Sequence, residues 1–148
     1  MEIINNIFVG DSRKVLKTFP DAVVNTTVTS PPYYNLRDYG NKNQIGLEDS
    51  LEDYLEQLCL VFDEVYRVTK DDGTFWLNIG DCYARGGEIN SDGRRGFSGA
   101  KGLGYKDKKV DGLTPKDLIG VPWRLAFELQ KRGWILRSDI IWAKLNPM

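Results

Sequence analysis

The chain has 148 residues, of which 41% are hydrophobic and 28% charged, and its formal net charge is −1. This composition is typical of one globular domain, and no apolar run approaches the roughly 20 residues that cross a bilayer, so disordered and membrane-spanning classes are excluded. Histidine is absent, which excludes triads, general bases and zinc sites built on an imidazole, and we expect no metal.

The N-terminal third of the chain predicts two strands and a short helix. Residues 1–11 have no basic segment ahead of an apolar one, which favours a cytoplasmic location over secretion. Residues 3–11 are expected to form a strand that ends in a Gly-Asp turn. Ser12 would then cap a helix over residues 13–19, stopped by Pro20. Residues 22–29 are β-branched on both faces, which predicts a strand covered on both sides in a parallel sheet.

The clearest helix begins after Ser50, an N-cap with Asp53 three residues on. Asp-Asp-Gly at 71–73 is expected to break this helix, and residues 74–80 then predict a second buried strand. The apolar residues of the helix recur at helical spacing: Leu51, Tyr54, Leu55, Leu58, Phe62 and Val65.

The C-terminal half opens with a glycine-rich loop over residues 83–113, in which seven Lys or Arg outnumber four acids. Thr114-Pro115 and Val121-Pro122 then predict one interrupted helix or two short helices, stopped by Gly133. Residues 134–145 predict one or two strands. Strands and helices therefore alternate, and the fold class is α/β with a mainly parallel sheet.

Ser30-Pro31-Pro32-Tyr33 stands where the strand at 22–29 ends. In open α/β sheets ligands bind beyond the carboxyl ends of the strands. Two prolines make a stiff turn that holds Ser30 and the neighbouring carbonyls in place. These acceptors, with the flat ring of Tyr33, could receive a planar group that carries an exocyclic amine.

Residues 28–33, Val-Thr-Ser-Pro-Pro-Tyr, resemble the catalytic signature of the DNA amino-methyltransferases. These enzymes transfer a methyl group from S-adenosyl-L-methionine to N4 of cytosine or N6 of adenine. Residues 46–81 and 121–148 are similar in order and spacing to the stretches that follow this signature in prokaryotic and phage enzymes of restriction-modification type. The resemblance implies an incomplete Rossmann-like methyltransferase sheet that lacks the cofactor-binding strands.

The resemblance also implies roles for single residues. Ser30 Oγ and the Pro31 carbonyl would accept hydrogen bonds from the target amine, and Tyr33 would stack on a base flipped out of the duplex. The implied cofactor contacts are Asp11, Thr29 and Ser30. The implied contacts to double-stranded DNA are Tyr34, Arg37 and Tyr39. The local excess of basic residues in the glycine-rich loop separately predicts phosphate contacts by Arg94, Arg95 and Lys101.

The second signature of the family, a Phe-x-Gly-x-Gly loop that binds the cofactor, has no counterpart among the 148 residues. We therefore expect residues 1–148 to be the catalytic-signature part of a methyltransferase domain. The cofactor half would follow residue 148 or belong to another chain. Its two strands would lie between those predicted at 3–11 and 22–29, so we expect a gap in the sheet. The chain alone is then expected to be inactive and to bind S-adenosyl-L-methionine weakly or not at all.

Several alternatives stay open. The Ser form of the signature favours cytosine N4, but adenine N6 is nearly as compatible. Methylation at cytosine C5 would need a cysteine thiolate in a Pro-Cys setting, which neither Cys59 nor Cys82 has, so both are expected in the core. A non-enzymatic DNA-binding fragment and a Pro-Pro-x-Tyr ligand of WW domains are the other candidates. The tryptophans are also expected in the core: Trp76, Trp123, Trp134 and Trp142.

Overall fold

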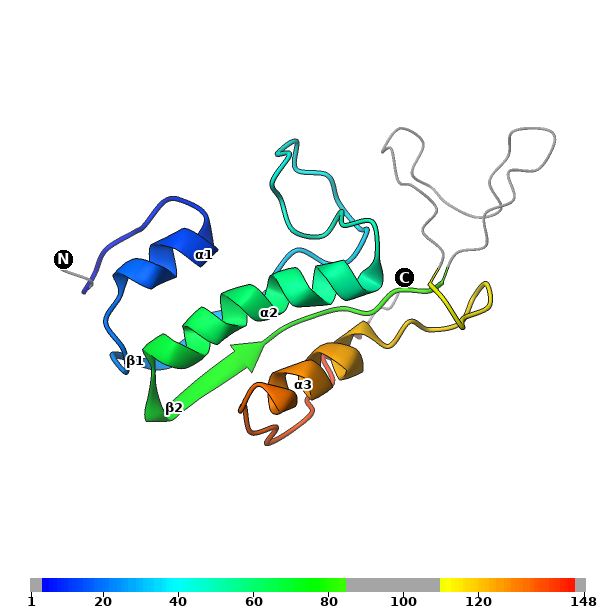
Figure 1. Ribbon diagram of the computed structural model, residues 1–148. Helices are drawn as coiled ribbons and strands as arrows, with labels where there is room; N and C mark the ends of the chain where they lie inside the picture. The colour runs from blue at the N-terminus through cyan, green and yellow to red at the C-terminus, as the bar shows by residue number, and fades with distance from the viewer. Residues whose placement is uncertain (1–3, 85–109, 146–148) are drawn as a thin grey trace.

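The computed structural model describes residues 4–84 and 110–145 and shows a mixed α/β arrangement. In chain order its elements are α1 (Ser12–Val15), the 3₁₀ helix η1 (Leu16–Thr18), β1 (Val24–Thr29), α2 (Leu51–Val68), β2 (Thr69–Leu77) and α3 (Val121–Lys131). β1 and β2 pair in parallel, and α2 is the crossover between them. In the view of Figure 1, β2 runs between α2 and α3. The predicted α/β class with a parallel sheet is confirmed.

α2 forms as the sequence predicts. Ser50 Oγ accepts from the Asp53 backbone N–H at 3.0 Å and donates to the Asp53 carboxylate at 2.7 Å, which satisfies one free N–H of the first turn. The apolar face of the helix forms the centre of the core, and Cys59 lies buried in it, as expected. Cys82 is half-buried against the same cluster. No described helix is long and apolar enough to span a membrane.

β2 begins directly after α2, so the break predicted at 71–73 is wrong. Residues 71–73 lie inside the strand, and the register shifts between the pairs Val24–Thr69 and Thr26–Thr74. A Cβ built on Gly73 would lie 3.0 Å from the Asn25 carbonyl oxygen, so glycine permits close approach of the two strands there. The glycine therefore serves the strand pairing instead of ending the helix.

One face of the sheet is open, contrary to the prediction of a strand covered on both sides. Val28 is 76% exposed and Trp76, its register partner on β2, is 51% exposed. Phe75, on the opposite face, packs on Phe62 and on Trp134 with ring centroids 5.0 and 4.9 Å apart. The expected burial of the tryptophans is therefore right for Trp134. It is wrong for Trp76, Trp123 and Trp142, whose side chains are exposed.

Two predicted strand regions are not strands in the structure. Residues 4–11 and 134–145 form no strand, and most of their apolar side chains are exposed, with Val9 at 94% and Ile141 at 76%. A strand is stable only when a neighbour receives its backbone hydrogen bonds, and the sheet of the described residues has two strands. The short apolar runs in these segments predicted strands, but no described segment pairs with these residues.

The helix predicted to start at Thr114-Pro115 is also wrong. Thr114 donates through its backbone N–H and its hydroxyl to the Asp117 carboxylate, both at 2.8 Å, and this closes a turn. An isolated bridge between Tyr83 and Leu118 follows. The start predicted at Val121-Pro122 is confirmed, because α3 begins there with a proline in its first turn.

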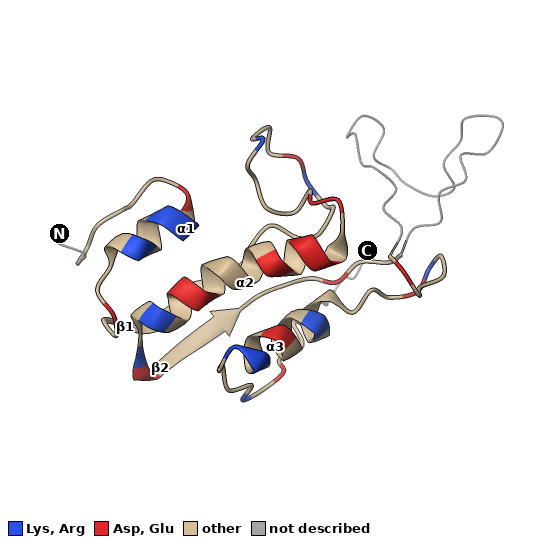
Figure 2. Cartoon of the chain, in the orientation of Figure 1, with Lys and Arg blue, Asp and Glu red and all other residues tan. Residues whose placement is uncertain are grey.

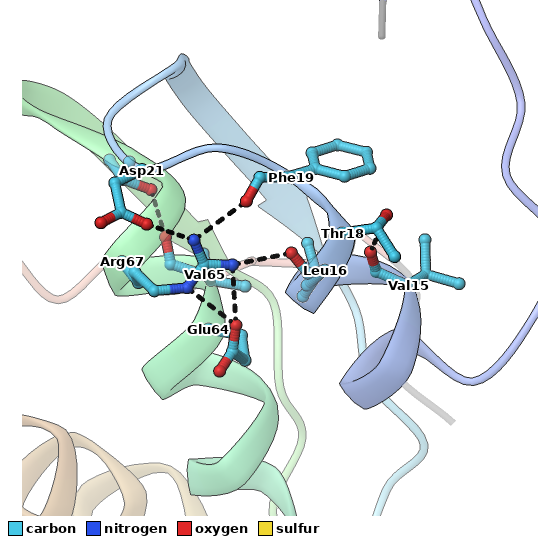
Figure 3. Close-up of polar contacts among 9 residues, drawn as sticks. Val15, Leu16, Thr18, Phe19, Asp21, Glu64, Val65 and Arg67 are labelled. Atoms are coloured by element: carbon cyan, nitrogen blue, oxygen red, sulfur yellow. Dashed lines mark hydrogen bonds and ion pairs between the residues drawn. The ribbon is translucent and has the colours of Figure 1, made fainter. Parts of the chain in front are cut away.

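Arg67 joins the N-terminal segment to α2 (Figure 3). Its guanidinium donates to the carbonyl oxygens of Leu16 at 2.8 Å and Phe19 at 3.0 Å, and it pairs with the carboxylates of Asp21 and Glu64. One planar group thus binds the carbonyl of the first η1 residue and the carbonyl of the residue just after η1. These contacts place residues 11–19 against α2.

Candidate functional site

The Ser30–Tyr33 segment lies at the carboxyl edge of the sheet. Thr29 and Leu77 are the last register pair of β1 and β2, and the Asn78 backbone N–H donates to the Thr29 carbonyl at 2.9 Å. Since the strands are parallel, residues 30–33 and 78–81 leave the sheet at the same edge. This is the position predicted for a ligand site.

Ser30 presents its hydroxyl to solvent, and the residues after it form a partly buried turn. Ser30 Oγ donates to the Tyr33 hydroxyl at 3.4 Å, which leaves the oxygen lone pairs of Ser30 as acceptors. Pro31, Pro32 and Tyr33 are half-buried. The exposed Ser30 hydroxyl therefore lies next to a half-buried proline turn.

Three residues that the sequence did not identify as part of the site contact this turn. The Tyr54 hydroxyl, on α2, donates to the Pro32 carbonyl at 2.9 Å. A Cβ on Gly46 would lie 3.0 Å from the Tyr33 carbonyl oxygen, and a Cβ on Gly80 would lie 2.7 Å from Tyr33 Cε2. Tyr54 was identified only as a core residue, because helical spacing indicates burial and does not show what a buried hydroxyl contacts.

Asp81 ties the loop after β2 to the N-terminus of α3. Its carboxylate accepts from the backbone N–H groups of Cys82 at 2.8 Å, Gly120 at 3.0 Å and Val121 at 3.0 Å. A carboxylate at a helix N-terminus satisfies free N–H groups and is stabilised by the helix dipole. The loop that carries Gly80 is thereby fixed at its far end.

Asp11 caps α1, a role predicted for Ser12. Its carboxylate accepts from the Arg13 backbone N–H at 3.0 Å and pairs with the Arg13 guanidinium at 2.8 Å. The hydrogen bonds from Arg13 hold the pKa of Asp11 below its ordinary value. The capping residue precedes the predicted one because the Asp11 backbone is extended while Ser12 is already helical.

An open cleft of about 620 Å³ lies beside Asp11. Basic residues of the N-terminal segment face acidic and amide groups of α2 and of the loop before it, and Figure 2 shows this division of charge between α1 and α2. The lining residues are Asp11, Arg13, Lys14, Lys17, Asn43, Gln44, Glu48, Asp53 and Gln57. Thr29 and Ser30 do not line it, so the structure does not bring the three expected cofactor contacts into one cleft.

The expected DNA contacts divide into three groups. Arg37 and Tyr39 are exposed, and the guanidinium carbon of Arg37 lies 5.9 Å from the centroid of the Tyr39 ring. In the same loop, the Gln44 side-chain oxygen accepts a hydrogen bond from the Tyr39 backbone N–H at 2.7 Å. Tyr34 is 3% exposed and packs on Tyr54, so a direct DNA contact is not possible for it in this structure. Arg94, Arg95 and Lys101 lie outside the described residues.

The same burial argues against the WW-ligand alternative. A Pro-Pro-x-Tyr ligand is read as an extended, accessible polyproline segment. Here the tyrosine of that pattern is Tyr34, in the core, and Pro32 contacts α2 through Tyr54 and the preceding loop at Gly46. The segment is therefore part of the fold.

Known DNA methyltransferases are similar to the chain over most of its length. The chain is 51% identical over 140 residues to the type II methyltransferase M.SmaI of Serratia marcescens, covering 95% of this chain and 48% of that protein. It is 48% identical over 148 residues to M.Cfr9I of Citrobacter freundii, covering 96% of this chain and 47% of that protein. The chain thus spans about half the length of the curated relatives it matches.

A solved structure shares the fold. It is that of a Thermus thermophilus protein, named as a candidate DNA modification methylase, in complex with S-adenosyl-L-methionine. The TM-score is 0.52 at 27% sequence identity, over 84% of this chain and 39% of that chain. Residues 24–148 match the family described as DNA methylase. This match covers most of the chain and includes the Ser-Pro-Pro-Tyr turn, so the chain belongs to the DNA methylase family.

Proposed function

We propose that the chain is the catalytic-signature part of a site-specific DNA methyltransferase. It would act on the N4 amine of a cytosine flipped out of double-stranded DNA, with S-adenosyl-L-methionine as the methyl donor. Adenine N6 is the second candidate, because adenine, like cytosine, carries an exocyclic amine on a planar ring. The observation that supports the proposal is the exposed Ser30 hydroxyl on a proline turn at the carboxyl edge of the sheet.

The residues of the turn would orient the target amine. Ser30 Oγ and the Pro31 carbonyl would accept its two N–H bonds, which draws the nitrogen lone pair out of conjugation with the ring. Tyr33 would supply a flat surface for the base, because base–aromatic stacking does not require a particular sequence. These groups are held by main-chain and core contacts, so little ordering is needed when the base enters.

When bound, S-adenosyl-L-methionine would supply the methyl group. The described residues do not form a complete pocket for it. The cleft at Asp11 is lined by charged and amide side chains, whereas an adenine ring needs an apolar wall. The Asp11 carboxylate is also engaged by Arg13. We therefore expect the isolated chain to bind this cofactor weakly, and micromolar affinity in a calorimetric titration would contradict that expectation.

The remaining contacts would come from a second part of the protein, after residue 148 or on another chain. The chain spans about half of its relatives, and the open face of the sheet at Val28 and Trp76 is apolar. Co-expression with the part of M.SmaI that the chain does not match is expected to give a copurifying complex with methyl-transfer activity, because that relative is 51% identical to this chain over 140 residues.

DNA binding would draw on Arg37 and Tyr39, and on Arg94, Arg95 and Lys101. Each basic residue that contacts a phosphate releases counterions, so affinity should fall steeply with salt. A fragment that binds DNA without methylating it is the competing function. It would show this salt dependence but transfer no methyl group.

Replacement of Ser30 tests the proposal. The complex is incubated with methyl-free genomic DNA and labelled S-adenosyl-L-methionine, and the nucleosides are identified by mass spectrometry. We expect N4-methylcytosine, its loss in Ser30→Ala, and unchanged DNA binding. Ser138→Ala, an exposed serine beyond α3, is the matched control and should retain activity. Equal turnover of Ser30→Ala and the unmodified protein would refute the role of Ser30, and N6-methyladenine as the product would select the second candidate.

A further inference from the structure

We infer that Gly80 is a positioning residue that sets the orientation of the Tyr33 ring. This inference rests on the proposed function, in which Tyr33 is the stacking surface for the target base. Gly80 follows the end of β2 at Leu77 by three residues and precedes Asp81, which is anchored on α3. Its position is therefore fixed on both sides.

The contact between Gly80 and Tyr33 leaves no room for a side chain. A Cβ on Gly80 would lie 2.7 Å from Cε2, 3.0 Å from Cδ2 and 3.4 Å from Cζ of Tyr33, and real Cβ atoms do not approach other heavy atoms as closely as the first of these. Any residue other than glycine must therefore displace the ring or the strand end that carries residue 80.

The backbone of Gly80 gives no other reason for glycine. The glycines with positive φ are Gly10, Gly40, Gly46, Gly112, Gly120 and Gly133 among the described residues, and Gly80 is not one of them. Alanine could adopt its backbone conformation. The requirement for glycine at position 80 thus comes from the Tyr33 ring.

The hydroxyl of the same ring contacts Ser30. The Tyr33 hydroxyl accepts from Ser30 Oγ at 3.4 Å, and the Tyr33 carbonyl lies against Gly46. With the main chain held at Gly46, the ring responds to pressure at residue 80 by rotating about its side-chain torsions. Such a rotation changes both the plane offered to a base and the distance to Ser30.

Gly73→Ala is a matched control for Gly80→Ala. Both glycines lie on or just after β2, and neither has a positive φ. A Cβ on Gly73 would lie 2.5 Å from Thr69 Cγ2 and 3.0 Å from the Asn25 carbonyl oxygen, so this substitution also disturbs the structure. Its close contacts are at the start of the strand, and Tyr33 is not among them.

The first test uses ¹⁹F NMR of the chain labelled with 3-fluorotyrosine, with the Tyr33 signal assigned by Tyr33→Phe. We expect Gly80→Ala to shift the Tyr33 signal and leave that of Tyr54 in place, whereas Gly73→Ala should leave Tyr33 unshifted. An unchanged Tyr33 signal in Gly80→Ala would overturn the inference, whatever the protein does to DNA.

The second test is a double-mutant cycle for methyl transfer in the complex. Gly80→Ala should lower the rate at least about tenfold with Tyr33 present, since small misplacements at a reacting group have large effects. It should lower the rate less than about threefold in the Tyr33→Ala background, where there is no ring to displace. Gly73→Ala should have the same effect in both backgrounds. Equal effects of Gly80→Ala in both would overturn the inference. An unmodified complex that transfers no methyl group would instead refute the proposed function, and the fluorine signal alone would then decide the positioning role.

Discussion

Tyr54→Phe tests whether the proline turn depends on one buried hydroxyl. Tyr54 is fully buried on α2, donates to the Pro32 carbonyl at 2.9 Å and packs on Tyr34 at 5.1 Å between ring centroids. Phenylalanine keeps the ring and removes the donor. Loss of this hydrogen bond to the half-buried Pro32 carbonyl should lower the unfolding free energy by about 0.5–1.5 kcal/mol. In a chain of this size each kcal/mol lowers Tm by about 2–4 °C.

The same substitution should alter the response to alkaline pH. Burial raises the pKa of Tyr54 well above its ordinary value. Because the folded pKa exceeds the unfolded one, the contribution of the neutral hydroxyl to stability is complete below pH about 10 and is lost as the pH rises further. Tyr54→Phe should therefore lose less stability above that pH than the unmodified chain.

Urea titrations monitored by circular dichroism, at pH 7 and at several values from 9 to 11, measure both effects. Tyr66→Phe is the control, because Tyr66 lies on the same helix and is 48% exposed. It should unfold as the unmodified chain does. If Tyr54→Phe were as stable as Tyr66→Phe at pH 7 and followed the same alkaline profile, the Tyr54–Pro32 hydrogen bond would not support the turn.

Three further predictions concern the elements that carry the site. Arg67→Lys should lower Tm, because one ammonium cannot reproduce the forked contacts of a guanidinium. It should also speed amide hydrogen exchange in residues 11–19. Unchanged exchange there would contradict this prediction. Ser50→Ala should lower the unfolding free energy by about 1 kcal/mol through loss of the cap to Asp53, in a urea titration, and Ser50→Asp should restore it. Burial raises the pKa of Cys59 to about 11. Iodoacetamide at pH 8 should therefore alkylate the half-buried Cys82 first, which peptide mass spectrometry measures. Faster labelling of Cys59 would refute its burial.

The features that the sequence predicted correctly depend on neighbours along the chain. The cap at Ser50 and the helical spacing of apolar residues up to Val65 specify α2 locally. The β-branched run before Ser30 specifies β1, and the two prolines end it. The resemblance of residues 28–33 to a methyltransferase signature also comes from adjacent residues, so it could be identified without coordinates.

The tertiary structure decided what depends on contacts between distant segments. Residues 4–11 and 134–145 contain short apolar runs that predict strands, but a strand also needs a partner for its backbone groups, and such a run does not supply one. The sequence predicted that Gly73 would help to end the helix before it, but in the structure this glycine allows β2 to lie close to β1. Tyr54 and Gly80 meet the Ser30–Tyr33 turn from 22 and 47 residues away, counted to Pro32 and Tyr33. Local propensity acts over a few residues, whereas the support of the site is assembled only when α2 and β2 pack beside β1.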